Sequence, residues 1–201
     1  ELVAHEFFHL WNVKRIRPAE LGPFDYEREV YTSLLWVMEG LTSYYDTLVP
    51  CRAKLFTPEK YFKKMIDRIR KYEEKPGRRR QSLSASSFDT WIKLYQPNEN
   101  AQNCQMSYYE KGEIVGMCLD LEIRRRSGKS LDDVMRHVYD LWGRRGRGFL
   151  GADACAHLDP RGSGQHTSPA LSRNGRGSCH PPIIRREDLA SYASALSTSL
   201  L

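Results

Sequence analysis

The chain has 201 residues, of which 40% are hydrophobic and 28% are charged, and its formal net charge is +6. This composition excludes a collagen-like, coiled-coil or wholly disordered protein, and it provides enough apolar side chains for one core. No apolar run approaches the roughly 18 residues of a membrane helix, so we expect no membrane span. Acidic residues are mixed among the basic ones, which favours a solvated surface over a nucleic-acid-binding face.

The first half of the chain reads as a succession of helices. Residues 2–12 are dense in helix-compatible side chains, and Pro18 ends that region. The prolines and the glycine between residues 18 and 23 predict a loop. Residues 30–49 form a long apolar-rich run, and Pro50 is expected to end the helix there.

Later helices carry start signals of their own. Thr57 is followed by a proline, which is typical of an N-cap and the first helical position. Ser107 is a candidate cap for a helix that runs to about residue 126, and Ser130 with Asp133 forms a capping box. No alternating strand of useful length occurs, so the fold class is predicted to be all-α.

Composition changes near residue 150. Of the 22 aromatic residues, 21 lie before that point, and the sequence beyond it is rich in Ser, Gly, Ala and Pro. Such a segment buries too little apolar surface to offset its ordering entropy. We therefore predict a folded domain over residues 1–148 and a low-order, irregular tail over 149–201.

The five cysteines are odd in number and form no C-x-x-C pair, which argues against a disulfide framework and favours a cytoplasmic compartment.

The strongest chemical signal is the H-E-x-x-H pattern of residues 5–9. On a helix, His5 and His9 point to one side and can share one cation, and Glu6 lies beside them within reach of a water at the metal. Phe7 and Phe8 are expected to face the opposite side and anchor the helix. Imidazole and carboxylate ligands suit zinc. The alternative is a helix with two exposed or hydrogen-bonded histidines and no metal.

A third ligand is expected at Glu39. This residue lies in the apolar run "LLWVMEGL", where a carboxylate is costly to bury unless it is paired, hydrogen-bonded or bound to a metal. A helix, a loop and a returning helix could bring it to His5 and His9. The alternative is a carboxylate on the exposed stripe of an amphipathic helix.

Three long segments are similar to a known family. "HEFFHLWNVKRIRP", "WVMEGLTSYYDTL" and the stretch over residues 81–136 closely resemble the M61 glycyl aminopeptidases, and the resemblance covers about residues 1–148. It implies a thermolysin-like helical catalytic subdomain. In that family a β-rich region precedes the zinc helix and a PDZ domain commonly follows the peptidase domain. Neither is recognisable here, so we expect a fragment of the catalytic domain.

The resemblance also implies roles for individual residues. His5, His9 and Glu39 match the ligands of one zinc ion per chain, and Glu6 matches the general base. The Y-E-K-G segment that begins at Tyr109 matches the one that supplies a transition-state tyrosine in the related M1 aminopeptidases. Adjacent helical residues point about 100° apart, so Tyr109 rather than its neighbour is expected to face the zinc.

Two classes of function follow from these expectations. The first is a zinc-dependent metallopeptidase, expected to be an aminopeptidase, with a peptide or protein substrate. The second is a truncated, non-catalytic zinc-binding remnant or peptide-binding module, which the absence of the β-rich region would favour. Hydrolysis of peptides with a chelator control separates the two.

Overall fold

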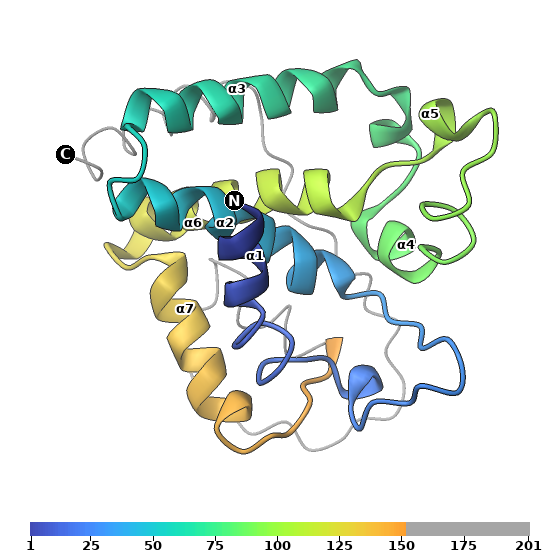
Figure 1. Cartoon of the computed structure of the whole chain (residues 1–201), viewed down its shortest axis with the longest axis horizontal. Coiled ribbons are helices and arrows are strands. Elements are labelled where there is room, and N and C mark those ends of the chain that lie inside the picture. The colour runs from blue at the N-terminus through green and yellow to red at the C-terminus, as the bar shows by residue number, and fades with distance from the viewer. Residues whose placement is uncertain (152–201) are drawn as a thin grey trace.

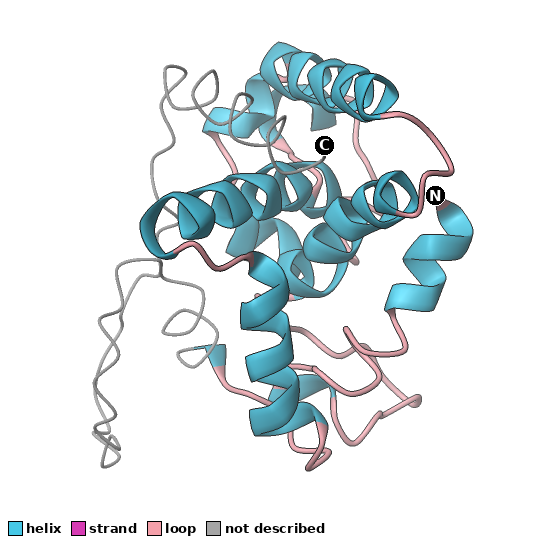
Figure 2. Cartoon of the chain, turned by 90° about the vertical axis from the view of Figure 1, so that its left-hand side faces the viewer, coloured by secondary structure: helices cyan, strands magenta, loops and turns pink. Residues whose placement is uncertain are grey.

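The computed structural model of the chain describes residues 1–151. In this part the fold is all-α, as the sequence predicts: helices and loops alone are present, with two isolated β-bridges and no strand (Figure 2). The tail predicted for residues 149–201 lies almost wholly outside the described residues. The elements in chain order are α1 (Leu2–Phe8), η1 (Ala19–Leu21), η2 (Trp36–Gly40), α2 (Leu41–Arg52), α3 (Pro58–Glu74), η3 (Pro76–Arg79), α4 (Leu83–Phe88), α5 (Ala101–Cys104), α6 (Tyr108–Ser127), α7 (Leu131–Val138) and η4 (Tyr139–Gly143).

Helices α2 and α6 form the centre of the core. The apolar faces of both helices are buried against each other, and α3 covers them along one edge of the molecule (Figure 1). The principal buried side chains are Leu41, Tyr44 and Leu48 of α2, Tyr61 and Met65 of α3, and Met117 and Leu121 of α6. Among residues 1–151, no helix combines the length and the apolar character needed to cross a bilayer.

A buried carboxylate joins three of these helices. Asp120 of α6 is 1% exposed and accepts a hydrogen bond from the Tyr44 hydroxyl of α2 at 2.7 Å. It also accepts from Arg124 Nε at 3.0 Å and from the backbone N–H of Leu131, the first residue of α7, at 2.6 Å. The charge is therefore paired and hydrogen-bonded, which a carboxylate at this depth requires.

The predicted caps at the start of α3 and α7 are confirmed. The Thr57 side chain accepts from the backbone N–H of Lys60, and Ser130 and Asp133 make the reciprocal bonds of a capping box. Ser107 precedes α6 as expected, but its side chain makes no cap hydrogen bond.

Two predicted helix ends are wrong. Helix α1 stops at Phe8 rather than near residue 12, because the chain turns sharply and Val13 adopts a φ of +147°. Helix α2 does not end before Pro50 but continues to Arg52. Pro50 lies in the last turn of α2, where the loss of one hydrogen bond leaves most of the helix intact.

Candidate metal centre

The three side chains predicted as metal ligands lie together where α1 meets η2. His5 is on α1, His9 is its C-terminal cap residue, and Glu39 is on η2, a π-helix. Glu39 Oε2 is 3.1 Å from His5 Nε2 and 3.3 Å from His9 Nε2. One donor atom from each residue lies within 4.8 Å of the others. Both outer nitrogens therefore converge on one carboxylate oxygen.

The inner nitrogen of each histidine has a fixed partner. His5 Nδ1 is 3.0 Å from Asp46 Oδ2, and His9 Nδ1 is 2.8 Å from the backbone oxygen of Asn12. Both partners are acceptors, so each Nδ1 donates its proton to its partner. Each Nε2 faces Glu39, to which it donates when the ring is protonated, and it offers a lone pair to a metal ion when the ring is neutral. This is the arrangement in which protein histidines bind metal ions.

Sequence reasoning missed both of these partners. Asp46 lies seven residues after Glu39, two helical turns along the chain, and this spacing places both carboxylates on one side of α2 and η2. This seven-residue spacing is a signal from which Asp46 could have been predicted to lie near the site. Asn12 contributes a backbone oxygen, for which the sequence offers no signal.

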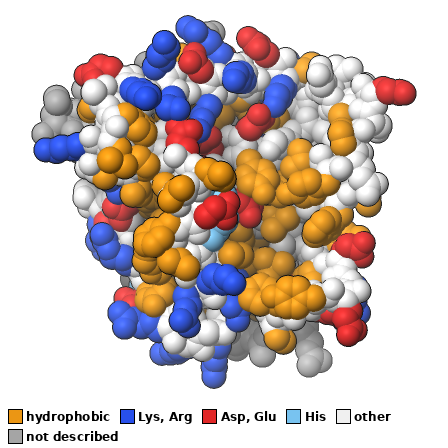
Figure 3. All heavy atoms as spheres, in the orientation of Figure 1, with side chains coloured by type: hydrophobic (Ala, Val, Ile, Leu, Met, Phe, Trp, Pro, Cys, Tyr) orange, Lys and Arg blue, Asp and Glu red, His pale blue; other side chains and the backbone are white. Residues whose placement is uncertain are grey.

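The centre is sheltered but open to solvent on one side. The side chains of His5, His9 and Glu39 are 14%, 16% and 21% exposed. The hydrogen bond to Glu39 raises the pKa of His9 above its ordinary value, although burial opposes this shift. Acidic side chains and a histidine lie near the middle of one face of the molecule, between two groups of hydrophobic side chains (Figure 3). Two imidazole nitrogens, one carboxylate oxygen and an accessible side fit a three-ligand zinc site.

Glu6 projects from the exposed side of α1. Its negative charge contributes to the raised pKa of His9, so it lies within electrostatic range of the centre.

The prediction for the two phenylalanines is half right. Phe8 stacks on Tyr45 at 4.5 Å between ring centroids, whereas Phe7 is 60% exposed. Successive helical residues diverge by about 100°, so only one of them reaches α2.

Tyr109 lies beside the centre at the start of α6. Its ring centroid is 6.4 Å from that of His5, and its pKa is raised by burial, by hydrogen bonds to Tyr108 and Tyr95, and by the charge of Glu39. The rings of Tyr108 and Tyr109 do not point apart as expected but stack at 4.5 Å. Both hydroxyls lie 3.4 Å from the Tyr95 hydroxyl.

Two glycines bring the elements that carry Glu39 and Tyr109 into backbone contact. A Cβ atom added to Gly112 of α6 would lie 2.8 Å from the Cα of Gly40, and one added to Gly40 would lie 2.5 Å from the Cα of Gly112. Real Cβ atoms essentially never approach that closely. Only glycine at both positions permits this separation of η2 and α6.

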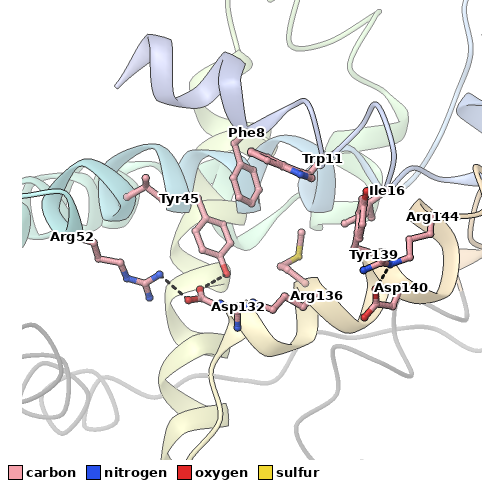
Figure 4. Close-up of a pocket in the computed structure, with 12 residues that line it drawn as sticks. Phe8, Trp11, Ile16, Tyr45, Arg52, Asp132, Arg136, Tyr139, Asp140 and Arg144 are labelled. Carbon is pink, nitrogen blue, oxygen red and sulfur yellow. Dashed lines mark hydrogen bonds and ion pairs between the residues drawn. The ribbon is translucent and has the colours of Figure 1, made fainter.

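A separate cavity lies beside α1. It has a volume of about 430 Å³ and is lined by Phe8, Tyr45, Met135 and other side chains, but by none of the three candidate ligands. At its edge the Tyr45 hydroxyl and Arg52 both donate hydrogen bonds to Asp132 (Figure 4). The candidate metal centre and this cavity are therefore separate sites.

Comparison with known proteins gives a family match and a similar solved structure. The family model described as M61 glycyl aminopeptidase matches residues 1–115. The crystal structure of an aminopeptidase N family protein from Idiomarina loihiensis is similar with a TM-score of 0.74 and 36% sequence identity. The alignment covers 77% of this chain and 27% of the Idiomarina chain, so the present chain spans about a quarter of that protein. No curated protein matches.

Proposed function

The chain belongs to the M61 glycyl aminopeptidase family, and from this premise we propose that it is the zinc-binding part of a metallopeptidase that acts as an aminopeptidase. One observation carries the proposal: the Nε2 atoms of two histidines converge on the Glu39 carboxylate, while each Nδ1 is held by an acceptor. A pair of merely surface-exposed histidines would not need this arrangement.

His5 Nε2, His9 Nε2 and a Glu39 oxygen would hold one zinc ion. Such an ion supplies Lewis-acid chemistry and lowers the pKa of coordinated water toward 7. Asp46 would orient the ring of His5, and the Asn12 backbone oxygen would orient that of His9.

Two further side chains would handle the proton and the developing charge. The Glu6 carboxylate is exposed beside the centre, so it is available to accept a proton from the attacking water and return it to the leaving amine. The Tyr109 hydroxyl is a neutral donor at pH 7, because the ordinary pKa of a phenol is about 10 and burial raises that of Tyr109 further. It is therefore suited to donate a hydrogen bond to the oxyanion of the transition state.

Zinc binding is tested by elemental analysis of the purified protein. We expect a ratio near one zinc per chain, with a large loss in His5→Ala and Glu39→Ala. His137→Ala is the matched control, because His137 lies on α7 outside the cluster. Full zinc content in either ligand variant would overturn the assignment of the ligands.

Activity is tested with a peptide that has a free N-terminus and with its N-acetylated counterpart. An aminopeptidase is expected to cleave the first and spare the second, to lose activity with a chelator and to regain it with added zinc. Equal cleavage of both peptides would indicate an endopeptidase. Stoichiometric zinc without hydrolysis would favour the non-catalytic alternative, and hydrolysis that resists the chelator would contradict zinc dependence.

A further inference from the structure

Asn12 contacts both halves of the metal centre. It is fully buried, and its backbone oxygen accepts the hydrogen bond from His9 Nδ1 at 2.8 Å. Its side-chain amide donates to the backbone oxygens of Val37 and Met38, both at 2.9 Å. One residue thus holds a histidine on one element and the turn that carries Glu39 on another.

The orientation of this amide is fixed by its partners. Two carbonyl oxygens can only accept hydrogen bonds, and the Thr42 hydroxyl nearby donates its own proton to Met38. The NH₂ group must therefore face them, whereas the Asn12 Oδ1 atom has no hydrogen-bond partner among the described residues. The Asn12 side chain therefore stabilises the η2 turn through its N–H donors.

The element that Asn12 holds is an unusual one. Residues Trp36–Gly40 form a π-helix, whose wider turn departs from α-helical hydrogen bonding and occurs mostly as single turns at functional sites. The two carbonyl groups that Asn12 binds directly precede Glu39 in this turn. Val37 and Met38 are core residues, and Asn12 supplies each carbonyl group with a donor from outside η2, while the Met38 oxygen also accepts from the Thr42 hydroxyl of α2.

The backbone next to Asn12 is strained. Val13 has a φ of +147°, a region that β-branched residues rarely adopt. Strain of this kind persists only where the surroundings over-determine the conformation. Here the backbone N–H of Asn12 donates to Phe8 at 3.1 Å, and its side chain is bound to η2.

We propose that Asn12 is a positioning residue that sets the separation between His9 and Glu39 and thereby the zinc affinity of the centre. It would act without touching the metal or the substrate. The inference rests on the proposed zinc site, because it gives Asn12 a role only if His9 and Glu39 are ligands.

The test compares Asn12→Leu, which keeps the branching of the side chain but removes its donors, with Met65→Ala. Met65 is a buried residue of α3, which supplies no member of the site, so its truncation lowers stability without touching the centre. The measurements are the zinc dissociation constant, by competition with a chelator of known affinity, and the visible spectrum of the cobalt-substituted protein. Circular dichroism selects a temperature at which each variant is folded.

We expect Asn12→Leu to raise the zinc dissociation constant by about 10- to 100-fold and to change the cobalt spectrum. Met65→Ala should leave both unchanged. Should Asn12→Leu fail to fold, Asn12→Ala provides the second variant, because it also removes the donors and introduces neither bulk nor charge. Unchanged affinity and an unchanged spectrum in a folded Asn12 variant would overturn the inference.

Failure of the proposed zinc site has a different signature. If His5→Ala and Glu39→Ala bind zinc as the unaltered protein does, the site itself is wrong. If those two variants lose zinc and the Asn12 variants retain it at full affinity, only the role of Asn12 is wrong.

Discussion

Replacement of Gly112 by alanine should force α6 away from η2. The added Cβ would lie 2.8 Å from the Cα of Gly40, about 0.6 Å inside the 3.4 Å at which ordinary contact begins, and 3.0 Å from the backbone oxygen of Trp36. Both obstacles are backbone atoms, so rotation of a side chain cannot relieve them. Overpacking of this kind costs up to about 3 kcal/mol, whereas alanine gains about 1 kcal/mol over glycine in a helix. We expect a net loss of about 2 kcal/mol.

Gly116→Ala is the matched control, one helical turn further along α6. Its added Cβ would meet the Cδ2 atom of Leu41 at 2.9 Å and the Cβ of Tyr44 at 3.2 Å, both in side chains. The end of a leucine can rotate away, so we expect a loss smaller by at least about 1 kcal/mol. Urea denaturation followed by circular dichroism measures both variants. Stability of Gly112→Ala equal to or above that of the unaltered protein would refute the backbone contact between η2 and α6.

Three further predictions concern the chemistry of the centre. Glu6→Gln should retain zinc but lower the rate of peptide hydrolysis by roughly 10²–10⁴, because an amide cannot accept the proton; near-normal turnover would place the base elsewhere. Tyr109→Phe should lower kcat by roughly 10²–10³ with a smaller change in KM and intact zinc content, whereas the same loss in Tyr108→Phe alone would transfer the role to Tyr108. In the metal-free protein, the hydrogen bond to Glu39 raises the pKa of His9 above its ordinary value of 6.5. The stabilisation by protonated His9 should therefore be complete below pH 6.5 and disappear as the pH rises through the raised pKa. Urea midpoints measured from pH 5 to 9 should show this loss in the unaltered protein and not in His9→Gln.

Much of the helical framework could be predicted because its signals are local. The Thr57 cap and the capping box of Ser130 with Asp133 depend on residues within one turn of each other, and both predictions are confirmed. The predicted end of α1 is wrong because that end depends on distant contacts. Asn12 turns the chain there through bonds to Val37 and Met38, which are 25 and 26 residues away.

The candidate ligands could be proposed from the sequence because H-E-x-x-H is a spacing on a single helix. The π-helical turn that carries Glu39 could not be predicted, because the sequence of residues 30–49 resembles that of an ordinary apolar helix. The exposure of Phe7 also escaped prediction, since α1 packs on α2 along one side only. Apolar character alone does not indicate which of two neighbouring phenylalanines has a partner.

The buried carboxylate of Asp120 has a consequence for which alternative folds the chain can populate. Two helices that meet through apolar side chains can in principle slide past each other by one turn, about 5.4 Å, and still bury much of the same surface. A slip of α6 along α2 would separate Asp120 from Tyr44 and from the first turn of α7. Separating a buried, hydrogen-bonded charge from its partners costs about 3–5 kcal/mol. This free energy reduces the population of the slipped register by a factor on the order of 10²–10⁴. A single acidic side chain thus excludes mis-registered packings that the apolar contacts alone would tolerate.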